Sequence, residues 1–206
     1  MRALILVDLQ YDFMPGGALA VSDGDATVAV ANQLTPRFEL VVATQDWHPA
    51  DHGSFITQHP HSAIGNQIQL DGLAQTVWPV HCVQNTRGAE LHGELDRSQI
   101  DCIIHKGTER TVDSYSGFFD NARRKSTGLA DYLKARGVDE VFVLGLATDY
   151  CVKFTALDAN SLGFRTHLIT DACRAVNLTP GDDQRAFAEC QAAGIDLIQS
   201  ANITKR

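Results

Sequence analysis

Short, largely apolar runs recur along the chain, and each one ends at a polar residue or a glycine. They occupy residues 3–7, 40–43, 102–104, 141–144, 166–170 and 195–198. Runs of Val, Ile and Leu without regular polar alternation are typical of strands that are buried on both faces of a parallel sheet.

Helical patterns lie between most of these runs. They cover residues 26–34, 126–136, 149–162 and 186–193, with Ser126 as a candidate cap and Gly137, Gly163 and Gly194 as stops. Strands that alternate with helices are joined by right-handed crossovers, which make neighbouring strands parallel. We therefore predict an α/β fold, a three-layer sandwich whose six-stranded parallel sheet carries helices on both faces.

The length of 206 residues suits a single domain that spans residues 1–206. Acidic residues outnumber basic ones by 25 to 17, which argues against nucleic-acid binding. No stretch approaches the ~20 apolar residues that cross a membrane, and residues 3–7 are too short for a signal segment. Five cysteines without a CxxC pair indicate free thiols in a reducing compartment. We expect a cytoplasmic protein with a small-molecule partner; a monomer and a homo-oligomer both remain open.

Charged and reactive residues follow several of the apolar runs. Asp8, Asp46 and Lys106 come at or just after the ends of three predicted strands, and residues 145–151 join a fourth strand to a helix. In an open parallel sheet, ligands bind beyond the carboxyl ends of the strands. The pattern therefore predicts a pocket that contains these side chains.

Cys151 lies where the predicted helix begins, and this position favours a thiolate because a helix N-terminus stabilises negative charge and lowers a thiol pKa. Most free cysteines are instead small buried hydrophobic residues. Asp8 and Lys106 favour a nucleophile, since an aspartate can accept the thiol proton and a lysine can stabilise the resulting anions. A structural salt bridge would explain Asp8 and Lys106 but not the adjacent cysteine.

Histidines gather in the long segment 47–99, which contains six of the eight in the chain and shows little periodicity. Asp46 and His48 are two residues apart, so on an extended backbone they point the same way and can ligate one metal ion. His52 or Ser54 could fold back toward that ion, and His81 is a further candidate ligand. The alternative interpretation is a polar loop with surface histidines.

Three aromatic residues, Phe13, Trp78 and Tyr115, lie in or near these segments and could line a pocket for a flat ring. Taken singly, each is more often an ordinary core or surface residue.

Five segments together resemble the nicotinamidase (pyrazinamidase) type of isochorismatase-like cysteine hydrolases. They are LILVDLQYDFMPGGALAV, TQDWHPADHGSF, WPVHCVQNTRGAEL, HKGTERTVDSYSGFFDN and GLATDYCVKFTALDA, in this order along essentially the whole chain. The resemblance implies a six-stranded parallel sheet with helices on both faces. It also implies hydrolysis of nicotinamide to nicotinate and ammonia through a thioester, as a step of NAD salvage, and activity on pyrazinamide.

The resemblance also implies roles for individual residues. The catalytic triad of the family falls on Asp8, Lys106 and Cys151. Its oxyanion hole falls on the amides of Ala147 and Cys151, next to a non-proline cis peptide bond between residues 146 and 147. Its ring-packing positions fall on Phe13, Trp78 and Tyr115.

The family's metal ligands fall on Asp46, His48 and His81, with Ser54 at a fourth position that is Ser in some members and His in others. One divalent ion is expected, zinc first, with iron and manganese as alternatives. Whether Ser54 ligates directly, and whether His52 has a role, remain open.

Three other functions are compatible with parts of the sequence. Related hydrolases of other small amides or carbamoyl compounds share the triad but generally lack the DxH segment that is present here at residues 46–48. A non-catalytic binding module would not need an intact triad. A nucleotide-binding Rossmann protein is disfavoured because no G-x-G-x-x-G motif follows residues 3–7.

Overall fold

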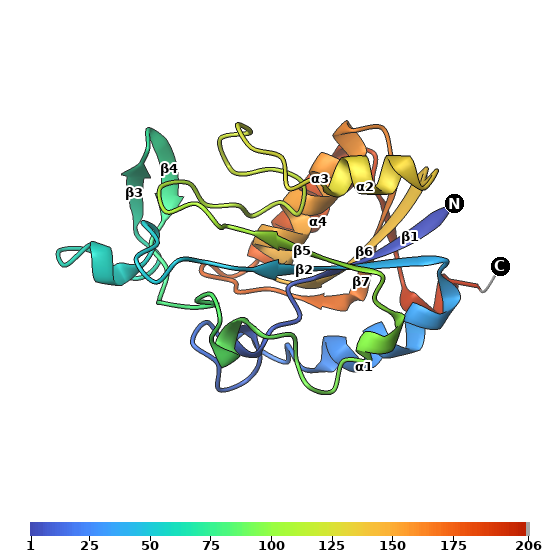
Figure 1. The fold of residues 1–206 in the computed structure, drawn as a ribbon, viewed down its shortest axis with the longest axis horizontal. Coiled ribbons are helices and arrows are strands. Elements are labelled where there is room, and N and C mark those ends of the chain that lie inside the picture. Colours follow the sequence, from blue (N-terminus) through green and yellow to red (C-terminus); the bar gives the residue numbers. More distant parts are fainter. Residues whose placement is uncertain (205–206) are drawn as a thin grey trace.

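A parallel six-stranded sheet forms the centre of the computed structural model, which describes residues 1–204 (Figure 1). The strand order is β5-β2-β1-β6-β7-β8, and every neighbouring pair is parallel. The strands are β1 (Arg2–Val7), β2 (Leu40–Asp46), β5 (Cys102–Lys106), β6 (Glu140–Leu146), β7 (Arg165–Arg174) and β8 (Asp196–Ile198). The six predicted strands and their parallel arrangement are therefore confirmed.

Helices cover both faces of this sheet, as predicted. They are α1 (Ala26–Leu34), α2 (Leu129–Ala135), α3 (Lys153–Ser161) and α4 (Asp182–Ala192). In Figure 1, α1 lies below the sheet, whereas α2, α3 and α4 lie above it. Because both faces are covered, residues 3–7 of β1 are completely buried, which explains their continuous apolar run. No helix within residues 1–204 is long and apolar enough to cross a membrane.

Several predicted boundaries differ from the structure. β2 continues to Asp46 and β5 to Lys106, where the two residues are register neighbours and their opposite charges pair. β7 extends to Arg174, beyond the predicted end at residue 170. The helix predicted from residue 149 begins instead with a π-helical turn, Thr148–Val152, before α3.

The segment 47–99 contains regular structure that its lack of periodicity concealed. β3 (Gln67–Leu70) and β4 (Leu73–Thr76) form an antiparallel hairpin. The two residues between them, Asp71 and Gly72, have φ values of 50° and 80°. An Asp-Gly pair at positive φ is a strong hairpin signal, so this element could have been found from the sequence. Three 3-10 turns complete the segment: Ile56–Gln58, Arg87–Ala89 and Arg97–Gln99.

The chain changes direction across the sheet at β1. From β1 it proceeds outward through β2 to β5, and it then returns to the other side of β1 with β6, β7 and β8. Such a reversal leaves a crevice beyond the carboxyl ends of the two central strands, where ligands bind in open α/β sheets. Asp8 follows β1 and residues 147–151 follow β6, so the fold brings both to this crevice.

Gly145 makes the close contact between β6 and β1 possible. Its φ is +129°, and a Cβ atom there would lie 2.1 Å from the Val7 backbone oxygen. We expect Gly145→Ala to lower the free energy of unfolding by roughly 3 kcal/mol, from backbone strain plus overpacking. Gly137→Ala is the control, since its φ is also positive but the added Cβ meets open space; its expected loss is about 1 kcal/mol. The free energies of unfolding are measured by urea denaturation. Equal losses in the two variants would contradict the role of the close contact between β6 and β1.

Candidate active site

The ammonium of Lys106 is completely buried at the centre of the crevice. Its Nζ lies 2.8 Å from Asp8 Oδ2, 2.5 Å from Asp46 Oδ1 and 3.3 Å from Cys151 Sγ. It also donates a hydrogen bond to the Ser114 backbone oxygen at 3.1 Å. The side chains of four separate segments therefore meet at one positive charge, as the strand-end pattern predicted.

Asp8 is positioned by the neighbouring strand as well as by Lys106. The Thr44 hydroxyl donates to Asp8 Oδ1 at 2.6 Å and accepts from the Asp8 backbone N–H at 3.2 Å. Burial raises the pKa of the Asp8 carboxyl to about 6, although the Lys106 charge opposes this rise. At neutral pH the carboxyl can therefore accept a proton and release it again.

The Cys151 thiol lies in the π-helical turn and is buried. Burial raises its pKa well above the usual value for a thiol; the anions of Asp8 and Asp46 add to this rise, and Lys106 opposes it. The expected lowering of the thiol pKa is therefore not met in this chain, because burial and the two neighbouring anions outweigh Lys106. A reactive thiolate needs an adjacent proton acceptor, and Asp8 is the base at hand.

The peptide bond between Leu146 and Ala147 is cis, as the family resemblance implied. Ala147 and Cys151 both line the same cavity at this point. Their role as oxyanion donors remains a prediction.

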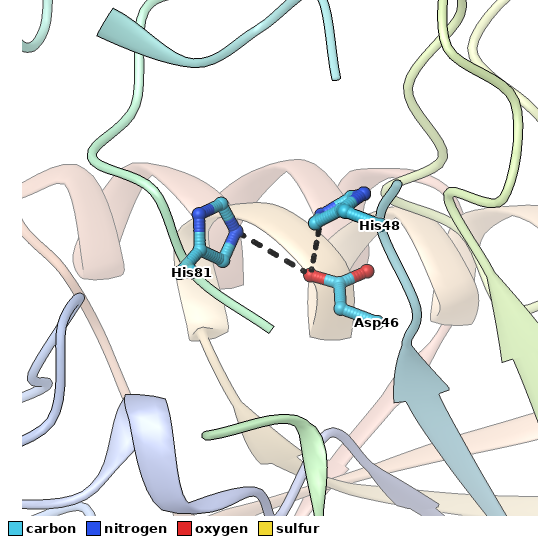
Figure 2. A group of neighbouring side chains, drawn as sticks. All are labelled: Asp46, His48 and His81. Atoms are coloured by element: carbon cyan, nitrogen blue, oxygen red, sulfur yellow. Dashed lines mark ion pairs between the residues drawn. The ribbon is translucent and has the colours of Figure 1, made fainter. Parts of the chain in front are cut away.

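Asp46, His48 and His81 form a buried group with the spacing of metal ligands (Figure 2). Asp46 Oδ2 lies 3.6 Å from His48 Nε2 and 3.8 Å from His81 Nε2. Each imidazole places its other nitrogen, Nδ1, 2.8 Å from a backbone carbonyl, that of Gly107 for His48 and of Pro79 for His81. Protonation of Nδ1 leaves the Nε2 lone pairs directed at one point beside the carboxylate, so the residues fit a divalent ion.

The charge states of Asp46 and His81 also suit metal binding, whereas at His48 the Asp46 anion outweighs burial and raises the pKa, so a bound ion would replace a proton there. Burial disfavours the Asp46 anion, but Lys106 and His48 outweigh burial and hold the pKa of Asp46 well below its usual range. Burial and the neighbouring His48 lower the pKa of His81 to about 4. A carboxylate and a neutral imidazole are the forms that ligate zinc.

Ser54 and His52 are completely buried beside the group. Ser54 Oγ lies 2.8 Å from His52 Nδ1, and the His52 ring is 4.4 Å from that of His48. Both residues therefore fold back toward the metal ligands, while direct ligation by Ser54 remains a prediction.

One cavity is lined both by Cys151 and by residues of the metal-ligand group. Its lining residues are Phe13, Leu19, Asp46, Trp78, His81, Asp113, Tyr115, Ala147, Tyr150, Cys151 and Val176. All three predicted aromatic residues are among them, and Trp78 Nε1 donates to the Tyr115 hydroxyl at 3.2 Å. Sequence reasoning missed Leu19, Asp113 and Val176, which reach the cavity from distant loops. It also did not single out Tyr150, although this residue directly precedes Cys151 in the predicted segment 145–151.

Two further polar residues support the site and were not predicted. The Gln10 side chain makes two hydrogen bonds with the Asp46 backbone, both at 2.8 Å: it accepts one from the N–H and donates one to the carbonyl oxygen. Thr44 holds Asp8 as described above. Thr44 lies two residues before Asp46 on β2 and thus on the same face, a signal that could have identified it.

The fold and the site define an α/β protein with a buried Cys–Asp–Lys centre at the switch point of its sheet. The isochorismatase domain model matches residues 2–202. The chain is 56% identical over 205 residues to the nicotinamidase of Escherichia coli K12, covering 98% of this chain and 96% of that protein. The chain belongs to the isochorismatase family.

Solved structures agree with this assignment. An Acinetobacter baumanii nicotinamidase/pyrazinamidase matches with a TM-score of 0.95 and 45% identity, covering 98% of each chain. The Pyrococcus horikoshii pyrazinamidase in complex with zinc matches with a TM-score of 0.78 and 40% identity, covering 96% of this chain and 98% of that one.

The coupling of Asp8 and Cys151 predicts how thiol reactivity depends on pH. The Asp8 carboxyl, with a pKa of about 6, becomes a carboxylate as pH rises through this value and can then accept the Cys151 proton as the sulfur reacts. Alkylation of Cys151 by iodoacetamide, followed by mass spectrometry, should accelerate as pH rises through about 6. In Asp8→Asn this acceleration should be absent and the rate at pH 7 roughly tenfold lower or more. Identical pH profiles in both proteins would contradict the coupling.

Proposed function

We propose that the chain hydrolyses nicotinamide to nicotinate and ammonia, with Cys151 as the nucleophile. One observation carries the proposal: a single cavity is lined by Cys151, by aromatic side chains, and by two residues of the Asp46–His48–His81 group. A carboxamide on a flat ring with a ligand nitrogen matches these three features. The 56% identical nicotinamidase supports this substrate.

In the first half of the proposed reaction, Asp8 takes the proton from Cys151 Sγ. The thiolate attacks the carboxamide carbon, and the resulting oxyanion accepts hydrogen bonds from the amides of Ala147 and Cys151. Lys106 stabilises both the carboxylate and the thiolate, since it contacts both groups. Asp8 then returns the proton to the leaving nitrogen, the C–N bond breaks, and ammonia departs from a Cys151 thioester.

In the second half, a water molecule replaces ammonia in the cavity. Asp8 takes a proton from this water, and the hydroxide adds to the thioester carbon. The C–S bond breaks, the proton returns to the Cys151 sulfur, and nicotinate leaves. The pKa of Asp8 near 6 suits a group that accepts and donates a proton twice in each cycle.

The walls of the cavity and the metal group orient the substrate. Phe13, Trp78 and Tyr115 pack against the ring. Asp46, His48 and His81, with Ser54 as a fourth candidate, would hold one divalent ion. When bound, this ion supplies a Lewis acid for the ring nitrogen. Zinc is our first choice, supported by the zinc complex of the Pyrococcus horikoshii relative, with iron and manganese as alternatives.

The same arrangement accommodates pyrazinamide, which carries a ring nitrogen at the same distance from its carboxamide. We place the reaction in NAD salvage in the cytoplasm, where the five free cysteines would remain reduced.

Cys151→Ala tests the nucleophile. Ammonia release from nicotinamide should fall by roughly 10⁴-fold or more, because Cys151 supplies the only thiol among the described residues that line the cavity. Cys102→Ala is the control, since Cys102 is at the start of the edge strand β5 and outside the cavity; its activity should stay within about twofold of wild type. A Cys151→Ala variant that retains a tenth of the activity would contradict the assignment.

Metal removal tests how the substrate is oriented. Chelation should lower kcat/KM for nicotinamide roughly 100-fold but for benzamide, which lacks a ring nitrogen, less than about tenfold. Added zinc should restore kcat/KM for nicotinamide and with it the preference for nicotinamide over benzamide. His48→Ala should lose bound zinc, measured by elemental analysis, whereas His61→Ala should keep it because His61 is exposed and outside the group. A metal-free enzyme that is fully active on nicotinamide would refute the metal assignment.

A further inference from the structure

A second histidine–carboxylate group adjoins the proposed metal site. His48, His52 and Asp113 are all buried, and one ligand atom of each lies within 4.8 Å of the others. His48 belongs to both groups. Within residues 1–204, His52 Nε2 makes no hydrogen bond of normal geometry, although the Val112 backbone carbonyl lies near the ring.

Asp113 connects this second group to the substrate cavity. Its side chain lines the cavity together with Asp46 and His81. Asp113 Oδ1 accepts from the Ser114 backbone N–H at 2.7 Å, and Oδ2 accepts from Gln75 Nε2 at 3.0 Å. Each oxygen thus has one hydrogen bond from the protein and keeps a lone pair free for a further donor.

Asp113 differs from the other two buried carboxyl groups of the site in its charged partners. Asp8 and Asp46 both pair with Lys106, whereas no Lys or Arg within residues 1–204 pairs with Asp113. A buried carboxylate without a cationic partner is costly. A divalent ion at the adjoining metal group would supply the missing positive charge.

We propose that Asp113 is the second carboxylate of the metal centre, a positioning residue whose negative charge beside His48 would strengthen the binding of a divalent ion. The role rests on the metal site of the proposed function. Asp113 therefore determines how tightly a divalent ion is held, in addition to the three ligands already described.

Zinc affinity of the full chain tests this role without reference to activity. Kd is measured by competition with a chromophoric chelator for wild type, Asp113→Asn and Gln75→Ala. Asparagine keeps the size of the side chain and an acceptor for Ser114 but removes the charge, so zinc should bind roughly 10- to 100-fold more weakly. Gln75→Ala removes a hydrogen bond to Asp113 and leaves its charge, so Kd should stay within about threefold of wild type.

Two results would overturn the inference. One is an unchanged zinc Kd in Asp113→Asn. The other is an equal loss of zinc affinity in Gln75→Ala, because the effect would then come from a displaced Asp113 loop and not from the lost charge. If Asp113→Asn does not fold, Asp113→Ser removes the same charge in a smaller side chain and carries the same expectation. Failure of the wild type to bind zinc is a separate result that would refute the metal site itself.

Discussion

The rest of the site depends on the electrostatic interactions of the buried Lys106 ammonium. It contacts Asp8, Asp46 and Cys151, so one positive charge serves the proposed nucleophile, its base and a proposed metal ligand. Without it, two carboxylates would lie buried beside each other, and their repulsion would be strong in an environment with little water. Lys106 lowers the pKa of both carboxyls. Burial outweighs it at Asp8, whereas at Asp46 the charge of Lys106 together with the neighbouring histidines outweighs burial.

The sheet topology explains why these groups meet. Asp46 and Lys106 end adjacent strands in register, and Asp8 follows β1, the next strand along the sheet. Cys151 arrives from the other side of the switch point after β6, where Gly145 allows close approach to β1. The loops after the strands then add the histidines and the aromatic walls. A small cavity with a nucleophile at one end and metal ligands at the other follows from this strand order.

Features that depend on local burial could be predicted from the sequence, and features that depend on distant partners could not. The apolar runs identified all six sheet strands, and the polar residues at their ends located Asp8, Lys106 and Cys151. The hairpin at Asp71 was missed although its signal was present. The hydrogen bond from Gln75 to Asp113 joins strand β4 to a loop 38 residues further along the chain, which no local pattern encodes. The pKa of Cys151 was misjudged because desolvation is a property of the folded site.

We propose that the cavity orients a ring amide between the metal group and the cysteine. The decisive experiment is a crystal structure of zinc-loaded Cys151→Ala with nicotinamide, with anomalous data at the zinc edge. The expected result is a zinc peak beside Asp46, His48 and His81, the ring nitrogen directed at that peak, and the carboxamide carbon facing residue 151. A carboxamide directed at the histidines, or zinc at another place, would contradict this orientation of the substrate.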